Sequence, residues 1–217
     1  MDTTMDTDYW HRKWQADDIG FHQADGNPLL HAHFKELSLP DGSRVFVPLC
    51  GKTRDIAWLL SQGYRVAGVE LSELAIQQLF AELGLEPAVV TKGGMKHYSA
   101  ADLDIFVGDI FQLTRKMLHP VDAVFDRAAL VALPEDMRIR YAVHITEVTG
   151  QAPQLLVTFE YDQTQMAGPP FSICDAEIRN HYQGSYQIAQ LASVDVAGKL
   201  KGKCVAKENV WLLKPRA

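Results

Sequence analysis

The sequence has few cysteines, no long hydrophobic run and no excess of positive charge. Its three cysteines, Cys50, Cys174 and Cys204, form no C-x-x-C pair, which is typical of a reduced cytoplasmic protein rather than a disulfide scaffold. No apolar run reaches the ~18 residues of a membrane span, and the acidic N-terminus does not resemble a signal peptide. A net charge of −6 argues against nucleic acid as a partner. We therefore expect a cytoplasmic protein with neither a membrane nor a nucleic-acid partner.

Glycine-rich phosphate motifs are also missing. The turn that follows residues 45–48 contains only Gly51, whereas a dinucleotide fingerprint G-x-G-x-x-G requires three glycines for close approach to a pyrophosphate. Gly51-Lys52-Thr53 matches the end of a P-loop, but Phe46 occupies the position of its first glycine. The turn therefore suits a ribose and a small charged group better than a polyphosphate.

The sequence offers little support for metal or hydrolytic chemistry. His31 and His33 form an H-x-H pair, but alternate residues of a helix point in different directions, and no third ligand accompanies them. No G-x-S-x-G, Cys-His or H-E-x-x-H arrangement is present. We expect neither a metal site nor nucleophilic hydrolysis.

What the sequence does contain is a β-α-β unit between Val45 and Glu70. It consists of a buried strand, a tight turn, a helix and a second strand that ends on a carboxylate. In open α/β sheets, the crevice at the carboxyl ends of the strands binds nucleotides, and a carboxylate about 20 residues after the turn binds ribose hydroxyls. The unit predicts a nucleoside-type cofactor; the alternative is an acid placed at a strand end for solubility alone.

Strand-like and helix-like segments alternate from Val45 onward, which predicts an α/β fold with a largely parallel sheet. A single domain is expected over residues 1–217, with an N-terminal lid or extension at 1–40 and an α/β core at 41–217. Residues 85–103 are compatible with either a short hairpin or an insertion. The expected helices are 55–62, 72–84, 134–150 and 175–181; the expected strands are 104–109, 122–127 and 154–161, with a closing antiparallel pair at 186–194 and 208–214.

The first 40 residues do not follow this alternation. Trp10 and Trp14 are four residues apart and would share one side of a helix. Asn27-Pro28 begins a second helix, whose apolar residues again lie on one face. The aromatic stripe either packs against the sheet or forms a lid over the strand-end crevice that excludes water.

Polar residues also follow several predicted strands. They are Glu70, Asp109 and the pair Asp126-Arg127. Each alone is compatible with a structural salt bridge. Because the carboxyl ends of parallel strands converge on one crevice, together they are expected to outline a pocket.

Several longer segments resemble bacterial thiopurine S-methyltransferases, a family of class I S-adenosyl-L-methionine-dependent methyltransferases. The matching segments are YWHRKW, GFHQ, FVPLCGKTRDIAWLLSQGYRVAGVELSELAI, FVGDIF, FDRAALVALP and ENVWLLK. The similarity covers nearly the whole chain, and PLCGKTRD followed by GVELSE and DRAALVALP is specific to this family. The resemblance implies a Rossmann-like, mostly parallel seven-stranded sheet with helices on both faces, an antiparallel last strand and an N-terminal lid.

The resemblance also implies a set of site residues. Glu70 would bind the ribose hydroxyls of S-adenosyl-L-methionine, and the turn at Leu49 would contact its methionine portion. Asp109 and Ile110 would flank the adenine, while Arg127 would lie close to both cofactor and acceptor. From the lid, Trp14 would close over the cofactor and Phe21 would contact the acceptor.

The implied activity is S-methylation of aromatic or heterocyclic thiols, such as thiopurines, by in-line methyl transfer. Heteroaromatic thiols ionise readily, so no dedicated strong base is expected, and Arg127 would orient the anionic acceptor. One alternative is a methyltransferase whose natural acceptor is a small selenium or tellurium species. Another is a non-catalytic sensor that binds the nucleoside cofactor, and a nicotinamide dehydrogenase is disfavoured by the missing glycines. We expect a monomer that acts on a small-molecule thiol.

Overall fold

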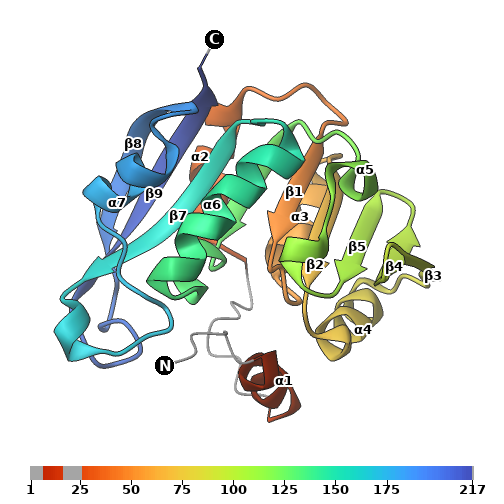
Figure 1. Cartoon of the computed structure of the whole chain (residues 1–217), viewed down its shortest axis with the longest axis horizontal. Coiled ribbons are helices and arrows are strands. Elements are labelled where there is room, and N and C mark those ends of the chain that lie inside the picture. Colours follow the sequence, from red (N-terminus) through yellow and green to blue (C-terminus); the bar gives the residue numbers. More distant parts are fainter. Residues whose placement is uncertain (1–6, 17–25, 217) are drawn as a thin grey trace.

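The computed structural model describes residues 7–16 and 26–216, and its centre is a mixed sheet of nine strands. The strands are β1 (Arg44–Pro48), β2 (Arg65–Glu70), β3 (Ala88–Lys92), β4 (Met95–Ala100), β5 (Leu103–Val107), β6 (Ala123–Arg127), β7 (Gln154–Tyr161), β8 (Tyr186–Asp195) and β9 (Ala206–Pro215). Their order in the sheet is β3-β4-β5-β2-β1-β6-β7-β9-β8. None of the described helices is long and apolar enough to cross a membrane. Helices lie on either side of the sheet, whereas the first helix lies beyond the ends of the strands (Figure 1).

The sheet confirms the predicted fold class. Strands β5, β2, β1, β6 and β7 run parallel, and the last strand, β9, is antiparallel between β7 and β8. These seven strands form the expected arrangement. The hairpin β3–β4 adds two antiparallel strands beyond β5, so the ambiguous residues 85–103 contain a hairpin at the edge of the sheet.

Two layers of helices cover the sheet, as Figure 1 shows, with α6 and α7 in front of the strands and α2 and α3 behind them. The helices are α1 (Thr7–Gln15), α2 (Pro28–His33), α3 (Arg54–Ser61), α4 (Glu73–Leu83), α5 (Arg115–Leu118), α6 (Glu135–Thr149) and α7 (Asp175–Tyr182), with short 3-10 turns η1 (Phe34–Leu37), η2 (Ile110–Gln112), η3 (Leu130–Ala132) and η4 (Gln163–Gln165). Apolar side chains of α5, α6 and α7 fill the core on one face of the sheet, and those of α2, α3 and α4 fill the core on the other. All residues of β1 are buried, as expected for a central strand covered on both faces.

Local capping signals explain most helix boundaries. The Ser72 side chain accepts a hydrogen bond from the Ala75 N–H at the start of α4, and Gly84 ends that helix in a left-handed conformation. Pro134 and Gly150 bound α6 as predicted. The predicted helix at 175–181 forms α7, but Asp175, whose residue type would suit an N-cap, lies in its first turn, where its negative charge complements the helix dipole; the N-cap residue is Cys174.

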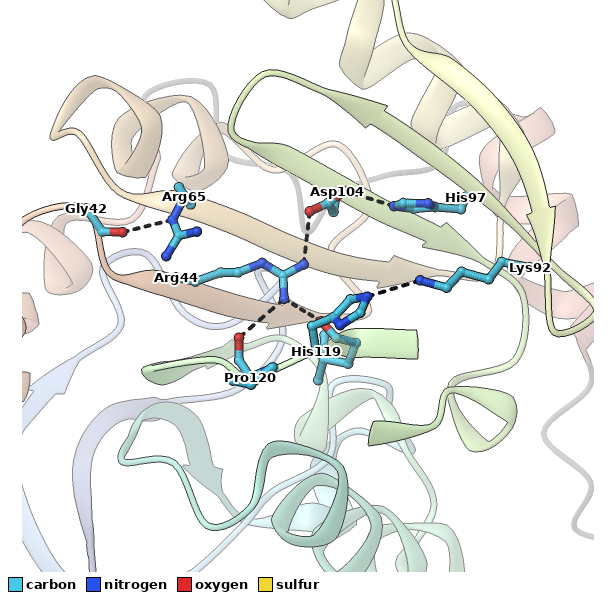
Figure 2. A network of polar contacts seen from close by, with 9 residues as sticks. Gly42, Arg44, Arg65, Lys92, His97, Asp104, His119 and Pro120 are labelled. Carbon is cyan, nitrogen blue, oxygen red and sulfur yellow. Dashed lines mark hydrogen bonds and ion pairs between the residues drawn. The ribbon is translucent and has the colours of Figure 1, made fainter. Parts of the chain in front are cut away.

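A charged network joins the parallel strands near their amino ends (Figure 2). Glu70, by contrast, lies at the carboxyl end of β2. Arg44 begins β1 and is 8% exposed. Its guanidinium donates to Asp104 Oδ2 at 3.0 Å and to the backbone carbonyl of Leu118, while its backbone N–H donates to Asp122 Oδ2 at 2.7 Å. Asp104 in turn lies 2.8 Å from His97 Nε2. Arg44 therefore links β1 to β5 and to the segment that leads into β6.

Replacing Arg44 is expected to lower stability without affecting ligand binding. Arg44→Ala leaves the Leu118 carbonyl and Asp104 without this donor, so we expect the free energy of unfolding in urea to fall by about 2–3 kcal/mol. Arg65→Ala is a matched control, since the Arg65 guanidinium makes one exposed bond, to the Gly42 carbonyl, and its loss should cost about 0.5 kcal/mol or less. Equal effects of the two substitutions would contradict this role.

Candidate active site

A cavity of about 520 Å³ lies at the carboxyl ends of the central strands. Its size is typical of sites for small ligands and cofactors. It is lined by α1, by the turn after β1, by the ends of β2 and β6, by β7, and by two segments near the C-terminus. The lining residues are Tyr9, Trp10, Lys13, Trp14, Leu49, Gly51, Glu70, Leu71, Arg127, Ala128, Val131, Ala132, Phe159, Pro169, Pro170, Val196, Leu200, Lys201 and Glu208.

The Glu70 carboxylate holds the turn after β1 in place. Its Oε2 accepts a hydrogen bond from the Gly51 N–H at 2.8 Å, and its Oε1 accepts one from the Ser72 N–H at 2.9 Å. In the turn, Leu49 and Gly51 have positive φ values of 46° and 50°. A left-handed leucine costs about 1–2 kcal/mol, so the surrounding contacts must hold it there. The carboxylate thus fixes both the turn and the start of α4.

The approach of the turn to β2 also depends on a glycine. A Cβ atom on Gly68 would lie 2.7 Å from Ile105 Cδ1, which is shorter than the contacts that real Cβ atoms make, and 3.0 Å from Cys50 Sγ, which is a tight contact. Gly68 therefore lets Cys50 pack directly against β2. Burial raises the pKa of the Cys50 thiol well above its usual range, so this cysteine is a packing residue and not a nucleophile.

Glu70 retains the capacity to bind a ligand. Burial raises the pKa of its carboxyl, and the backbone N–H groups of Ser72, Gly51 and Leu71 oppose that rise. A carboxylate has about four acceptor positions, so these N–H groups do not occupy all of them. Since Glu70 also lines the cavity, its remaining positions suit the two hydroxyls of a ribose.

Strand alternation explains which strand-end residues point toward one side. Glu70 and Val66 on β2 are an even number of residues apart, so their side chains point to the same face of the sheet. The same holds for Arg127 and Phe125 on β6, and for Glu208 and Val210 on β9. The three reference residues all pack in the core beneath α2, α3 and α4. The structure therefore brings Glu70, Arg127 and Glu208 to one cavity from three strands that are not adjacent in the sheet.

Asp126 does not belong to the pocket, contrary to the expectation that the Asp126-Arg127 pair would line it. It projects to the opposite face of the sheet and is 0% exposed. Its Oδ2 accepts a hydrogen bond from the Tyr141 hydroxyl at 2.6 Å, and its Oδ1 accepts one from the Leu130 N–H at 3.2 Å. Asp126 therefore ties α6 to the turn η3 and supports the cavity wall from behind. Burial raises the pKa of its carboxyl to about 6.

Asp109 and Ile110 do not line the cavity either. They follow β5, the neighbour of β2, so they lie near Glu70 in the sheet order. Asp109 is exposed and caps η2 through the Phe111 N–H, while Ile110 is buried and its carbonyl lies 2.8 Å from His144 Nε2. Their assignment to the adenine end of a cofactor stays a prediction.

The N-terminal segment has two roles in the described residues. Tyr9, Trp10, Lys13 and Trp14 of α1 line the cavity, and Trp14 is only 4% exposed. By contrast, α2 and η1 bury apolar side chains in the sheet core. The aromatic stripe of Trp10 and Trp14 therefore lies at the cavity, and its role as a lid stays a prediction. Phe21, expected to contact the acceptor, lies outside the described residues.

The wall contributed by the C-terminal third was not predicted. Phe159, Pro169, Pro170, Val196, Leu200, Lys201 and Glu208 come from segments far from the β-α-β unit. Lys201 donates to the Pro169 carbonyl at 2.9 Å and connects two of these segments. No local motif marks these positions. Only the pairing of β9 beside β7 brings them together.

His31 and His33, the H-x-H pair, lie on α2. No group of three histidine, cysteine, aspartate or glutamate side chains is arranged to hold a metal ion within residues 7–16 and 26–216. The His31 ring instead stacks on Trp58, with 4.6 Å between ring centroids.

Several solved structures that share this architecture are methyltransferases. One is an S-adenosylmethionine-dependent methyltransferase from Anabaena variabilis, with a TM-score of 0.65 and 13% identity, and the match covers 97% of this chain and 95% of that one. Another is the 1,6-didemethyltoxoflavin-N1-methyltransferase of Burkholderia thailandensis, with a TM-score of 0.63 and 17% identity, covering 97% of this chain and 87% of that one. The fold is therefore that of class I methyltransferases.

Sequence comparison identifies the family within this class. The family model of thiopurine S-methyltransferase matches residues 5–216. The thiopurine S-methyltransferase of Xanthobacter autotrophicus is 58% identical over 96% of this chain and 99% of its own length. That of Gluconobacter oxydans is 46% identical over 99% of this chain and 98% of its own. The chain belongs to the thiopurine S-methyltransferase family, which confirms the resemblance seen in its sequence motifs.

Changing Glu70 should weaken cofactor binding. Glu70→Gln turns an amide NH₂ toward either the Gly51 or the Ser72 N–H, and it also removes an acceptor for the ribose. We expect affinity for S-adenosylhomocysteine, measured by calorimetry, to fall by about 1–3 kcal/mol. Glu82→Gln on α4 removes a similar charge that pairs with Lys52 at the surface, and should leave affinity unchanged. Unaltered affinity of Glu70→Gln would place the ribose elsewhere.

Asp126 should make stability depend on pH. Its carboxyl holds a proton more tightly in the folded state than in the unfolded state, so the folded state loses stability as pH rises from about 4 to 6. Relative to Asp126→Asn, the wild-type free energy of unfolding should fall by about 3 kcal/mol across this window. A difference between the two proteins that is independent of pH would show that Asp126 has an ordinary pKa.

Proposed function

We propose that this protein transfers the methyl group of S-adenosyl-L-methionine to the sulfur of heteroaromatic thiols such as thiopurines. The observation that carries the proposal is the single cavity in which a buried carboxylate, Glu70, and a guanidinium, Arg127, meet at the carboxyl ends of the strands. The chain's membership of the thiopurine S-methyltransferase family supports both the reaction and its methyl donor.

The residues at one end of the cavity suit the cofactor. Glu70 would accept hydrogen bonds from the ribose hydroxyls. The backbone of the turn at Leu49 and Gly51 would contact the methionine portion, and Trp14 would cover it from α1. Asp109 and Ile110 would flank the adenine from the adjoining strand end.

The other end suits a flat, apolar acceptor. Phe159, Pro169 and Pro170 provide rings that match the faces of a heteroaromatic system, and Val131 and Leu200 extend this apolar wall. Phe21 is proposed to add to it from the N-terminal lid. The acceptor is thereby distinguished from the cofactor by an apolar rather than a hydrogen-bonding environment.

The bound cofactor supplies an activated sulfonium methyl group, so the protein must chiefly align the acceptor and exclude water. The α1 side chains Tyr9, Trp10 and Trp14 would keep water from the cavity. The Arg127 guanidinium would bind the negative charge of the acceptor thiolate and orient its sulfur toward the methyl group.

The proposal is tested by titrating the purified protein with S-adenosylhomocysteine in a calorimeter and then assaying methylation of 6-mercaptopurine. Micromolar binding together with turnover is the expected result. Absence of binding would contradict the proposal for cofactor and function together, whereas binding without turnover on any thiol would favour a cofactor sensor.

Arg127→Ala should impair use of the acceptor while the fold stays intact. Loss of the guanidinium removes the positive charge opposite the sulfur, so we expect KM for 6-mercaptopurine to rise about tenfold or more. Arg179→Ala, at an exposed ion pair with Asp175 on α7, is the matched control and should behave as wild type. Unchanged acceptor kinetics in Arg127→Ala would refute this role.

The protein is further proposed to act as a cytoplasmic monomer on a small-molecule thiol. Its three free cysteines, widely spaced in the sequence, support a reducing compartment. Light scattering of the purified protein would test the oligomeric state, and a molar mass of about twice 24.2 kDa would contradict a monomer.

A further inference from the structure

One acidic side chain in the cavity has no part in the function described so far. Glu208 lies on β9, paired with Phe159 of β7, and both residues line the acceptor end of the cavity. Arg127 and Asn27 are its polar neighbours, so its charge is compensated even beside an apolar wall. Its carboxylate lines the same cavity as the proposed acceptor site.

The surroundings of Glu208 leave its carboxylate able to accept a proton. Burial raises the pKa of the carboxyl, the positive charge of Arg127 lowers it, and the nearby Asp55 raises it. Asn27 Nδ2 approaches Oε1 at 3.4 Å, at the outer limit of a hydrogen bond. The net effect is a carboxylate that is more basic than an exposed glutamate.

The other carboxylate in the cavity is less suited to this task. Among the described residues, Glu70 and Glu208 are the two acids that line the cavity, and no histidine lines it. Glu70 is held by the Gly51 and Ser72 N–H groups and belongs to the proposed ribose site. Asp126 lies on the other face of the sheet. Glu208 is thus the acid available to the acceptor.

Many heteroaromatic thiols carry their proton on a ring nitrogen, as the thione H–N–C=S, instead of on sulfur. Methylation of the sulfur then requires loss of the N–H proton. A thiophenolate, by contrast, has already lost its proton and needs no base. A carboxylate beside the ring would therefore accelerate the methylation of thiones but not that of thiophenolates.

We propose that Glu208 accepts the ring N–H proton of thione acceptors during methyl transfer. As a sulfur lone pair forms the new S–CH₃ bond, the bond between the methyl group and the cofactor sulfonium breaks, and its electron pair stays on the cofactor sulfur. The N–H proton passes to the Glu208 carboxylate, the electron pair of that bond forms the ring C=N bond, and the π pair of the C=S bond moves onto the acceptor sulfur as a lone pair. Arg127, near Glu208, stabilises the negative charge that this shift places on the sulfur before the methyl group arrives. This inference rests on the proposed function.

The test compares two acceptors in Glu208→Gln. 6-Mercaptopurine, below its own pKa, carries the N–H proton, whereas 4-nitrothiophenol is ionised and lacks one. We expect kcat for 6-mercaptopurine to fall about 100-fold, the usual contribution of general base catalysis, and kcat for 4-nitrothiophenol to change by less than about twofold. Glu160→Gln, an exposed acid on β7, removes the same charge nearby and should leave both rates unchanged.

Binding provides a readout that does not depend on turnover. The glutamine oxygen can still accept the N–H hydrogen bond, so calorimetric affinity of Glu208→Gln for 6-mercaptopurine, with S-adenosylhomocysteine bound, should stay within about fivefold of wild type. Retained binding with lost turnover of this acceptor alone supports the inference.

Two results would overturn it: wild-type turnover of 6-mercaptopurine by Glu208→Gln, or an equal loss of rate with both acceptors. Failure of the wild-type protein to bind S-adenosylhomocysteine or to methylate either acceptor would instead contradict the proposed function itself.

Discussion

The two hydrogen bonds that the Glu70 carboxylate accepts from Gly51 and Ser72 are the constraint on which the site depends. They join the turn after β1, the end of β2 and the start of α4 at one point. Leu49 is held in a left-handed conformation beside them, and Gly68 gives the turn room to approach. One side chain thereby shapes the crevice and lines it. In the proposed ribose site, this carboxylate would already be fixed before the ligand arrives, which would lower the entropy lost on binding.

The sheet separates the tasks of stability and chemistry. At the amino ends of the strands, Arg44 holds β1 against β5 and the segment before β6 (Figure 2). On the face covered by α6, Asp126 supports the turn η3 from behind the cavity wall. At the carboxyl ends, Glu70, Arg127 and Glu208 meet in the cavity. Neighbours in the sequence, such as Asp126 and Arg127, serve different tasks because successive strand residues point to opposite faces.

Local signals made much of the fold predictable. The β-α-β unit, the Ser72 and Gly84 caps of α4, and the pairing of β8 with β9 all follow from short-range patterns. The Gly93-Gly94 pair is a hairpin signal that would have resolved residues 85–103. Strand alternation likewise would have placed Asp126 away from the pocket. The position of Glu208 was less accessible, because it depends on the long-range register between β7 and β9 and not on any local motif.

In the proposed arrangement, one cavity holds the cofactor at Glu70 and the acceptor between Arg127 and Glu208. A crystal structure with S-adenosylhomocysteine bound would test this arrangement. We expect both ribose hydroxyls within hydrogen-bonding distance of Glu70, with the sulfur directed toward the end of the cavity that contains Arg127. A ribose bound away from Glu70, or a sulfur directed away from Arg127 and Glu208, would contradict it.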